Sequence, residues 1–240
     1  MRIKAVVAYD GSAFQGFQRQ TKTEQTVTTA IEKALQSLRI DSPITGSGRT
    51  DASVHATGQV IHLDLPYYWQ DLQKLLHALN QKHEAITFKH FTPVADDFHA
   101  RFDAKMRIYR YLFKSSKPSV FERNYISHYS DFDPLILTKA LMLFEGEHDF
   151  AYFHKRGADP HTTRRYIYQS LYRNFGTYHA IYFKANGFLR SQVRMMVEAA
   201  IQCAQSKLTL GQLADQLALK RRYTTDLAPA NGLYLARVIY

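Results

Sequence analysis

The sequence predicts an α+β protein whose two halves repeat one order of elements. Runs rich in β-branched and aromatic residues are followed by segments in which apolar residues recur at helical spacing. In each half the order is strand, helix, strand, strand, helix, strand. This is the split βαβ, or ferredoxin-like, arrangement, in which helices cover one face of an antiparallel sheet.

The expected elements can be assigned to residue ranges in both halves. In the first half we expect strands at 3–9, near Ile44, at 59–65 and at 86–88, with helices at 27–38 and 72–79. In the second half we expect strands at 107–113, 163–174, 178–186 and 233–239, with helices at 135–144, 189–205 and 207–220. The middle strands of the second half form a hairpin across Asn174-Phe175-Gly176-Thr177. We expect two domains, at 1–104 and 105–240, because the boundary falls near Ala104.

The charge balance indicates a polyanionic partner. The chain has a net charge of +10 in 240 residues, and its basic residues are spread along the whole length without a dense run. This pattern favours a folded basic surface over a disordered basic tail. The alternative is that the charge only keeps the protein in solution. The 16 tyrosines and 15 phenylalanines are mostly core residues, but such rings also stack on bases extruded from an RNA helix.

Several classes of protein are excluded by composition. The single cysteine, Cys203, lies in an apolar helical run and is expected to be a buried, inert thiol, so no intrachain disulfide forms. No His-Glu-x-x-His or paired-cysteine spacing indicates a metal site. The apolar run after the N-terminus is too short for a signal peptide, and nothing reaches the length of a membrane span. We therefore expect a soluble, cytoplasmic protein.

The most informative segment is Gly48-Arg49-Thr50-Asp51-Ala52-Ser53-Val54-His55-Ala56, where a carboxylate and a guanidinium lie on one tight turn. A nearby cation keeps a carboxylate ionised, and an ionised carboxylate can act as a nucleophile or base. The structural alternative is that Asp51 only caps its own backbone, as aspartates on turns usually do.

The wider pattern closely resembles the catalytic loop of the tRNA pseudouridine synthase A family, since Gly58-Gln59-Val60 follows the loop as it does there. Other segments match the family in order along the whole chain. They are 9–12, 14–20, 26–35, Phe98-His99-Ala100-Arg101-Phe102, 107–111, 146–150, Thr163-Arg164, 186–189, Val193-Arg194-Met195 and 228–235.

The resemblance implies an enzyme that isomerises uridine to pseudouridine at positions 38, 39 and 40 of the tRNA anticodon stem-loop. It also implies two domains whose sheets join around a central RNA-binding cleft, and a homodimer in which one tRNA touches both subunits. The reaction breaks the base–ribose C–N bond, turns the base and rejoins it through carbon. It involves no redox step or energy input, so we expect no cofactor and no metal.

The same resemblance assigns four residues. Asp51 is the nucleophile or base, and attack at ribose C1′, attack at uracil C6 and proton removal at ribose C2′ all remain open. Arg49 enters the RNA duplex or contacts the phosphate of the extruded uridine, or else it is a surface arginine that pairs with Asp64 or solvent. Tyr109 stacks on the target uracil, unless it is a core tyrosine. Arg194 pairs with Asp51 across the cleft.

Weaker signals and two departures complete the comparison with the family. His55 and His148 are expected to order loops through their ring N–H groups. Ser53 stands where the family has glycine. If that site needs a positive φ, serine there costs about 1 kcal/mol of conformational strain. Glu198 stands where a small glycine is usual, one turn after Arg194, and it could compete for that arginine.

Two other functions are alternatives to this interpretation. A tRNA chaperone without catalysis has no need of the Asp51 carboxylate. A retaining glycosidase or nucleosidase needs two carboxylates flanking the bond, and no second acid accompanies Asp51 in the motif.

Overall fold

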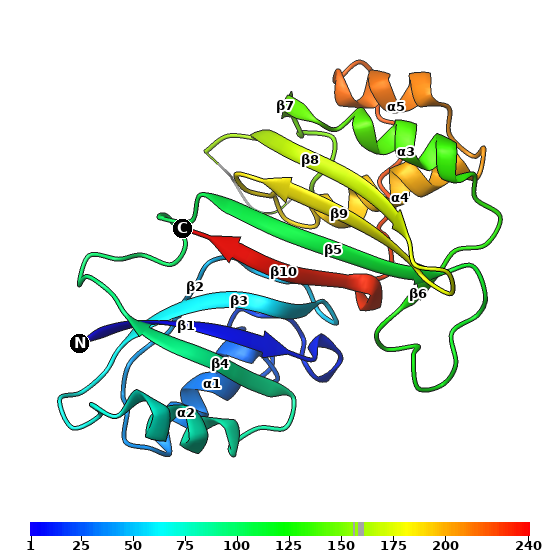
Figure 1. The fold of residues 1–240 in the computed structure, drawn as a ribbon. Helices are drawn as coiled ribbons and strands as arrows, with labels where there is room; N and C mark the ends of the chain where they lie inside the picture. The colour runs from blue at the N-terminus through cyan, green and yellow to red at the C-terminus, as the bar shows by residue number, and fades with distance from the viewer. Residues whose placement is uncertain (156, 158–160) are drawn as a thin grey trace. The chain divides into compact units, whose positions relative to one another are not determined.

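The computed structural model describes residues 1–155, 157 and 161–240, and its fold is α+β (Figure 1). Within these residues there are five α-helices, and the strand pairing is mixed, since both antiparallel and parallel pairs occur. The chain forms two compact units. Unit 1 comprises Met1–Lys105 with Tyr234–Tyr240, and unit 2 comprises Met106–Leu233.

The sheet of unit 1 has the strand order β4-β1-β3-β10, and the short β2 pairs with β3. Its elements are β1 (Arg2–Tyr9), α1 (Val27–Gln36), β2 (Thr45–Gly46), β3 (His55–Asp64), α2 (Leu72–Asn80), β4 (Ile86–Pro93) and β10 (Leu233–Ile239). Strand β1 is central, because it pairs antiparallel with both β3 and β4. Both helices lie on the same side of this sheet (Figure 1).

The core of unit 1 lies between the sheet and its helices. Alternate residues of β1 are buried, so Ile3, Ala5 and Val7 form one apolar face. Helix α1 begins at Thr26, whose side chain accepts a hydrogen bond from the Thr29 amide, as N-cap threonines do. The buried residues of α1 recur at helical spacing, so they form one continuous side of the helix.

The sheet of unit 2 has the order β7-β8-β9-β5, and the short β6 pairs with β5. Its elements are β5 (Met106–Lys114), β6 (Ser127–His128), α3 (Pro134–Met142), β7 (Gly146–Asp149), β8 (Arg164–Asn174), β9 (His179–Ala185), α4 (Gln192–Ala204) and α5 (Leu210–Leu217). Helix α4 is buried on most sides, since it packs against both α3 and α5.

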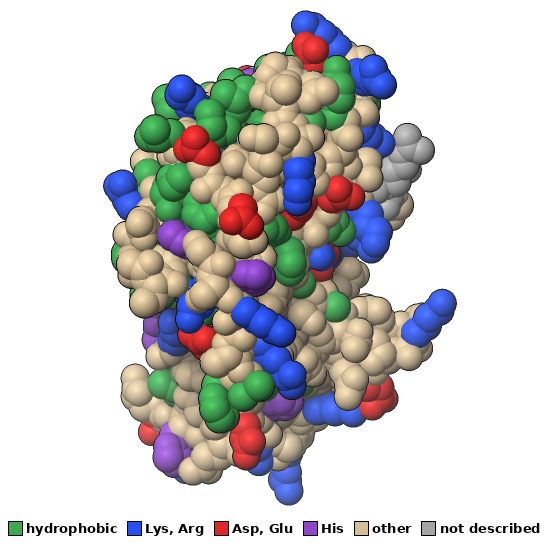
Figure 2. All heavy atoms as spheres, turned by 90° about the vertical axis from the view of Figure 1, so that its right-hand side faces the viewer, with side chains coloured by type: hydrophobic (Ala, Val, Ile, Leu, Met, Phe, Trp, Pro, Cys, Tyr) green, Lys and Arg blue, Asp and Glu red, His purple; other side chains and the backbone are tan. Residues whose placement is uncertain are grey.

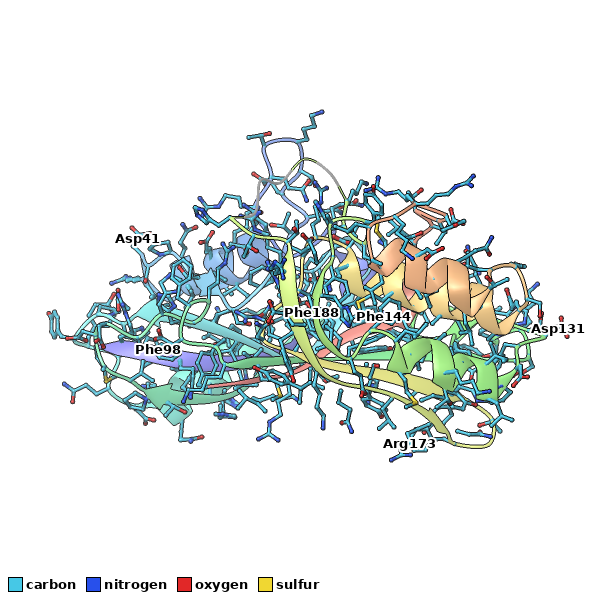
Figure 3. All side chains as sticks on the ribbon, turned by 90° about the horizontal axis from the view of Figure 1, so that it is seen from above. Asp41, Phe98, Asp131, Phe144, Arg173 and Phe188 are labelled. Atoms are coloured by element: carbon cyan, nitrogen blue, oxygen red, sulfur yellow. The ribbon has the colours of Figure 1, made fainter. Side chains whose placement is uncertain are left out.

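Aromatic rings dominate the core of unit 2. Phe144, Phe153 and Phe183 have no exposed surface, and the Phe144 ring meets the other two edge-on at centroid distances of 5.4 and 6.3 Å. Edge-to-face packing is the favourable arrangement for such rings. Figure 3 labels Phe144, near the end of α3, and Arg173, at the far end of the β8–β9 hairpin.

Every helix and strand expected from the sequence is present, with small shifts at the ends. The largest differences are in β3 and β4. Strand β3 begins at His55, four residues earlier than expected, because β10 pairs with its first residues. Strand β4 ends at Pro93, five residues later than expected, because it stays paired with β1 as far as Ile3. The short strands β6 and β7 were not expected. The last strand groups with unit 1, whereas the predicted second domain runs over 105–240; that domain division stays a prediction.

Among the described residues, no α-helix combines the length and the apolar character that a membrane crossing needs. The same residues contain no group of three or more His, Cys, Asp or Glu side chains that could hold a metal ion.

Cys203 is buried in α4, as expected, with 3% of its surface exposed. Burial raises the pKa of its thiol to about 11, because the thiolate is disfavoured away from water. We predict that the folded protein reacts negligibly with a thiol reagent at pH 8 and reacts fully in urea. Rapid labelling of the folded protein at pH 8 would contradict the buried position.

Candidate active site

Asp51 lies on the loop at 47–54 that connects β2 to β3 in unit 1. The two strands pair antiparallel, with Thr45 opposite His62 and Gly46 opposite Ile61. The Ser47 amide then donates to the Val60 carbonyl at 2.8 Å, which extends the pairing by one more residue. The loop therefore starts and ends on neighbouring strands, and its two ends are fixed by the sheet.

Gln59 anchors the first part of this loop. Its side chain has no exposed surface. Its Oε1 accepts from Ser47 Oγ at 2.7 Å, and its Nε2 donates to the Gly48 carbonyl at 3.0 Å. A buried amide without these partners would leave polar groups unsatisfied at a cost of about 1–3 kcal/mol. The loop conformation and the burial of Gln59 therefore depend on each other.

Two glycines let the N-terminal segment pass directly against the loop. A Cβ on Gly11 would lie 2.1 Å from the Val54 carbonyl oxygen, so no other residue fits there. Gly16 has φ +109°, and its Cβ would lie 3.1 Å from the Thr50 oxygen. Just beyond it, the Phe17 amide donates to this same Thr50 oxygen at 3.1 Å. The segments at 9–12 and 14–20 therefore pack against the Asp51 loop.

Side chains fix the second part of the loop. The His55 ring is 2% exposed, and its Nδ1 accepts from the Gly11 amide at 3.0 Å. Its ring stacks on Tyr234 of β10 at a centroid distance of 4.7 Å. The same Nδ1 also lies 3.3 Å from the Asp10 carboxylate, so this ring joins the start of β3 to the N-terminal segment and orders the loop. The hydroxyls of Tyr9 and Thr50 also share a buried hydrogen bond of 2.8 Å.

Asp51 itself opens a tight turn. The Val54 amide donates to the Asp51 carbonyl at 3.2 Å, and Ser53 has φ +62°. A residue at this position of the turn must have a positive φ, which glycine adopts without strain and serine does not. The departure noted at Ser53 therefore falls on a site that does require the left-handed conformation. The Asp51 side chain is half-buried.

Arg49 is exposed two residues before Asp51. Its expected alternative partner, Asp64, is instead bound by Arg2 through two contacts of 2.9 Å, and this bond holds the Asp64 pKa below its usual value. The expected pairing of Arg49 with Asp64 is therefore wrong, whereas the other alternative, a surface arginine that faces solvent, stays open. Within the described residues Arg49 has no hydrogen-bond or ion-pair partner, so its guanidinium is available to a ligand.

Tyr109 lies on β5 of unit 2, on the face that also carries Tyr111 and Phe113. It is 8% exposed, and its ring meets Phe188 edge-on at 5.1 Å. Phe188 precedes α4 and is labelled in Figure 3. Tyr109 is therefore packed as core residues are, near the N-terminal end of β5.

Arg194 lies in the first turns of α4, where its Nε donates to the Ala228 carbonyl at 2.7 Å. Glu198 accepts hydrogen bonds from the Tyr129 hydroxyl at 2.5 Å and from Gln202 at 3.4 Å. Burial raises the pKa of the Tyr129 phenol, so it remains a proton donor to this carboxylate. Both Glu198 oxygens therefore have partners other than Arg194, and the anticipated competition is not seen.

The structure thus divides the predicted residues between the units: Asp51 and Arg49 in unit 1, Tyr109 and Arg194 in unit 2. His148 lies on β7, and its Nε2 lies 2.8 Å from the carbonyl of Glu145, the residue just before that strand. The anchoring role of Gln59 was missed, because within an apolar run it looks like an ordinary strand residue. Its place directly before Val60, in a motif shared with the resemblance, was the available signal.

Comparisons with known proteins show the family to which this chain belongs. A family model described as tRNA pseudouridine synthase matches residues 5–103 and 140–240. The tRNA pseudouridine synthase A of Campylobacter jejuni (strain RM1221) is 38% identical over 244 residues, covering 100% of both chains. That of Wolinella succinogenes is 37% identical over 237 residues, covering 98% of this chain and 93% of the relative.

A third relative, tRNA pseudouridine synthase A of Helicobacter pylori (strain J99), is 39% identical over 245 residues, covering 99% of this chain and 98% of its own. A crystal structure of a Cbf5-Nop10-Gar1 complex gives a TM-score of 0.34 at 14% identity, covering 81% of this chain and 44% of that one, which is too low to support an argument. The chain belongs to the tRNA pseudouridine synthase family. It is an isomerase that converts uridine to pseudouridine in tRNA.

The strained turn gives a stability prediction. Ser53→Gly should raise the free energy of unfolding by about 1 kcal/mol, because glycine adopts the positive φ without strain. Ala52→Gly is the matched control: Ala52 is exposed on the same turn with no positive φ, so glycine there should lower stability by about 0.4–1 kcal/mol. Urea unfolding measures both. Equal effects of the two substitutions would contradict the argument.

The Gln59 anchor gives an activity prediction. Gln59→Glu keeps the shape but replaces the donor to the Gly48 carbonyl with an acceptor. We expect kcat to fall about 10- to 100-fold, because small displacements of a reacting group are costly, while tRNA affinity stays within about twofold. Gln36→Glu, on the exposed end of α1, is the control and should leave kcat unchanged. A normal kcat for Gln59→Glu would show that the anchor does not position Asp51.

Proposed function

We propose that Asp51 is the catalytic nucleophile or base, and that the substrate uridines are those at positions 38, 39 and 40 of the anticodon stem-loop. The observation that carries the proposal is the way the Asp51 loop is held. Gln59 fixes its beginning, Gly11 and Gly16 pack against its backbone, and His55 fixes its end. A turn that only capped its own backbone would need none of these supports.

Such support matches the chemistry. Attack at ribose C1′, attack at uracil C6 and proton removal at ribose C2′ all require one carboxylate held at a fixed distance from the substrate. Positioning of this kind supplies a large share of the rate enhancement in enzymes. A half-buried side chain on a rigid turn satisfies the requirement in each case, and the three routes remain alternatives.

The proposal extends to three further residues. Arg49 contacts the RNA duplex or the phosphate of the extruded uridine, which its exposure in the described structure supports. Tyr109 contacts the target uracil through its ring, and Phe188 then supports that ring from the side. Arg194 pairs with the Asp51 carboxylate and keeps it ionised. Its backbone anchor at Ala228 is consistent with a fixed orientation.

At the level of the fold, we propose two ferredoxin-like domains at 1–104 and 105–240, with joined sheets and a central RNA-binding cleft. The order β4-β1-β3 in unit 1, with helices on one side, supports the first of these. On the face drawn in Figure 2, Lys and Arg side chains lie among Asp and Glu side chains, and the support for a polyanionic partner is the net charge of +10. We further propose a cytoplasmic homodimer, which sedimentation of the purified protein at several concentrations tests.

Asp51→Asn tests the catalytic assignment. The amide is nearly isosteric with the carboxylate but is neither a nucleophile nor a base, so pseudouridine formation should fall below detection. Binding of tRNA should stay within a few fold. The assay is tritium release from C5-labelled uridine in tRNA transcripts, together with mapping of the modified positions.

Asp41→Asn is the matched control, because Asp41 is an exposed aspartate of the same unit and lies away from the loop. It should leave both activity and binding unchanged. Turnover by Asp51→Asn near the parent rate would overturn the catalytic role. Modification at other tRNA positions would overturn the assignment to 38, 39 and 40.

A further inference from the structure

Two arginines of unit 2 lie on the same sheet face as Tyr109. Arg107 is two residues before Tyr109 on β5 and therefore points to the same side. Across the sheet, Ala185 of β9 is paired with Arg107 on one side and with Ile167 of β8 on the other. Arg165 is two residues before Ile167, so it too lies on this face.

The segment between β9 and α4 joins the two arginines. Arg107 donates from Nη1 to the Asn186 carbonyl at 3.0 Å. The next residue, Gly187, lies against Arg165, whose Nε would be 3.6 Å from a Cβ at that position. Phe188 follows and contacts the Tyr109 ring. The two guanidinium groups therefore lie next to the side chain that we propose contacts the target uracil.

Arg165 is held in place without a carboxylate. Its Nη1 donates to the carbonyls of Thr162 at 2.9 Å and Arg164 at 2.5 Å, and within the described residues it has no ion pair. The nearby Glu147 does not compensate it, because Glu147 lies on the opposite face and approaches Arg164 at 3.6 Å. These bonds orient the side chain and leave Nε and Nη2 available.

The two positive charges repel each other. Burial and the charge of Arg107 both lower the pKa of Arg165, with burial the larger cause. Arg165 is half-buried and has no carboxylate partner among the described residues, and groups perturbed in this way cluster at sites where a ligand binds. The remaining donors of Arg165, Nε and Nη2, match the oxygens of a phosphate group.

We propose that Arg107 and Arg165 together bind a backbone phosphate of the tRNA, next to the uridine that contacts Tyr109. The proposal rests on the proposed function, since it assumes that Tyr109 faces the substrate. It assigns these two side chains to substrate binding and gives the site a ligand, one phosphodiester group of the RNA strand.

The test compares two adjacent arginines. Arg165→Gln should weaken tRNA binding about tenfold at physiological salt and reduce the slope of log K against log [salt] by about one. Arg164→Gln is the matched control, because it removes the same charge one residue away on the opposite face. It should change the affinity less than about twofold. Equal losses for both variants would mean that only overall charge matters, and would overturn the proposal.

A second arm identifies the phosphate. Anticodon stem-loop RNAs carrying one neutral methylphosphonate at a time are titrated against the parent and Arg165→Gln. At one position near the target uridine, the neutral linkage should weaken the parent about tenfold and leave Arg165→Gln unaffected. If no position behaves this way, the assignment is wrong. Inorganic phosphate at matched ionic strength should compete only weakly; complete competition at millimolar phosphate would indicate a free-anion site instead.

Unfolding measurements separate a ligand-binding role of Arg165 from a structural one. Arg165→Gln removes the repulsion between the two arginines, so the urea midpoint of this variant should stay the same or rise. Arg165→Lys keeps the charge but loses the forked guanidinium, so it should bind tRNA with an affinity between those of the parent and Arg165→Gln. A lowered midpoint with unchanged RNA affinity would make Arg165 a structural residue and overturn the proposal. All of these readouts are binding or unfolding measurements, so failure of the proposed function would appear separately, as absent pseudouridine formation by the parent protein.

Discussion

The loop that carries Asp51 depends on a single buried amide. Gln59 can be buried within β3 only if both ends of its side chain find partners, and the loop supplies both, through Ser47 and the Gly48 carbonyl. The same strand then places His55 under the far end of the loop. One strand thus fixes the loop at two points, and the position of Asp51 between them is set by the sheet.

The close packing of three segments explains why small residues surround the site. The N-terminal segment touches the loop through Gly11 and Gly16, and β3 approaches β10 at Gly58, where a Cβ would lie 2.4 Å from the Ala236 oxygen. Each of these contacts is between backbones, so a side chain at any of them would force the strands or the loop apart. The glycines therefore define how near the neighbouring segments come to Asp51.

Much of the fold could be predicted from the sequence, because the period of the apolar residues reports which face each element buries. The positions of β1, α1, β5 and α4 follow directly from it. The start of β3 does not, since His55 and Gly58 are unusual strand residues that become paired only when β10 arrives. Asp51 was identified through its motif. The proximity of Arg107 and Arg165 could not be predicted from the sequence. The two residues are 58 positions apart, and only the register of three strands brings them together.

The pairing of β10 with β3 has a consequence for how the molecule folds. Unit 1 is discontinuous in sequence, because all of unit 2 lies between Lys105 and Tyr234. Tyr234 stacks on His55 beside the Asp51 loop. During synthesis, the ribosome must therefore complete unit 2 before the strand that closes unit 1 exists. Contacts so distant in sequence form late, so the Asp51 loop acquires its final support only after the other unit has been made.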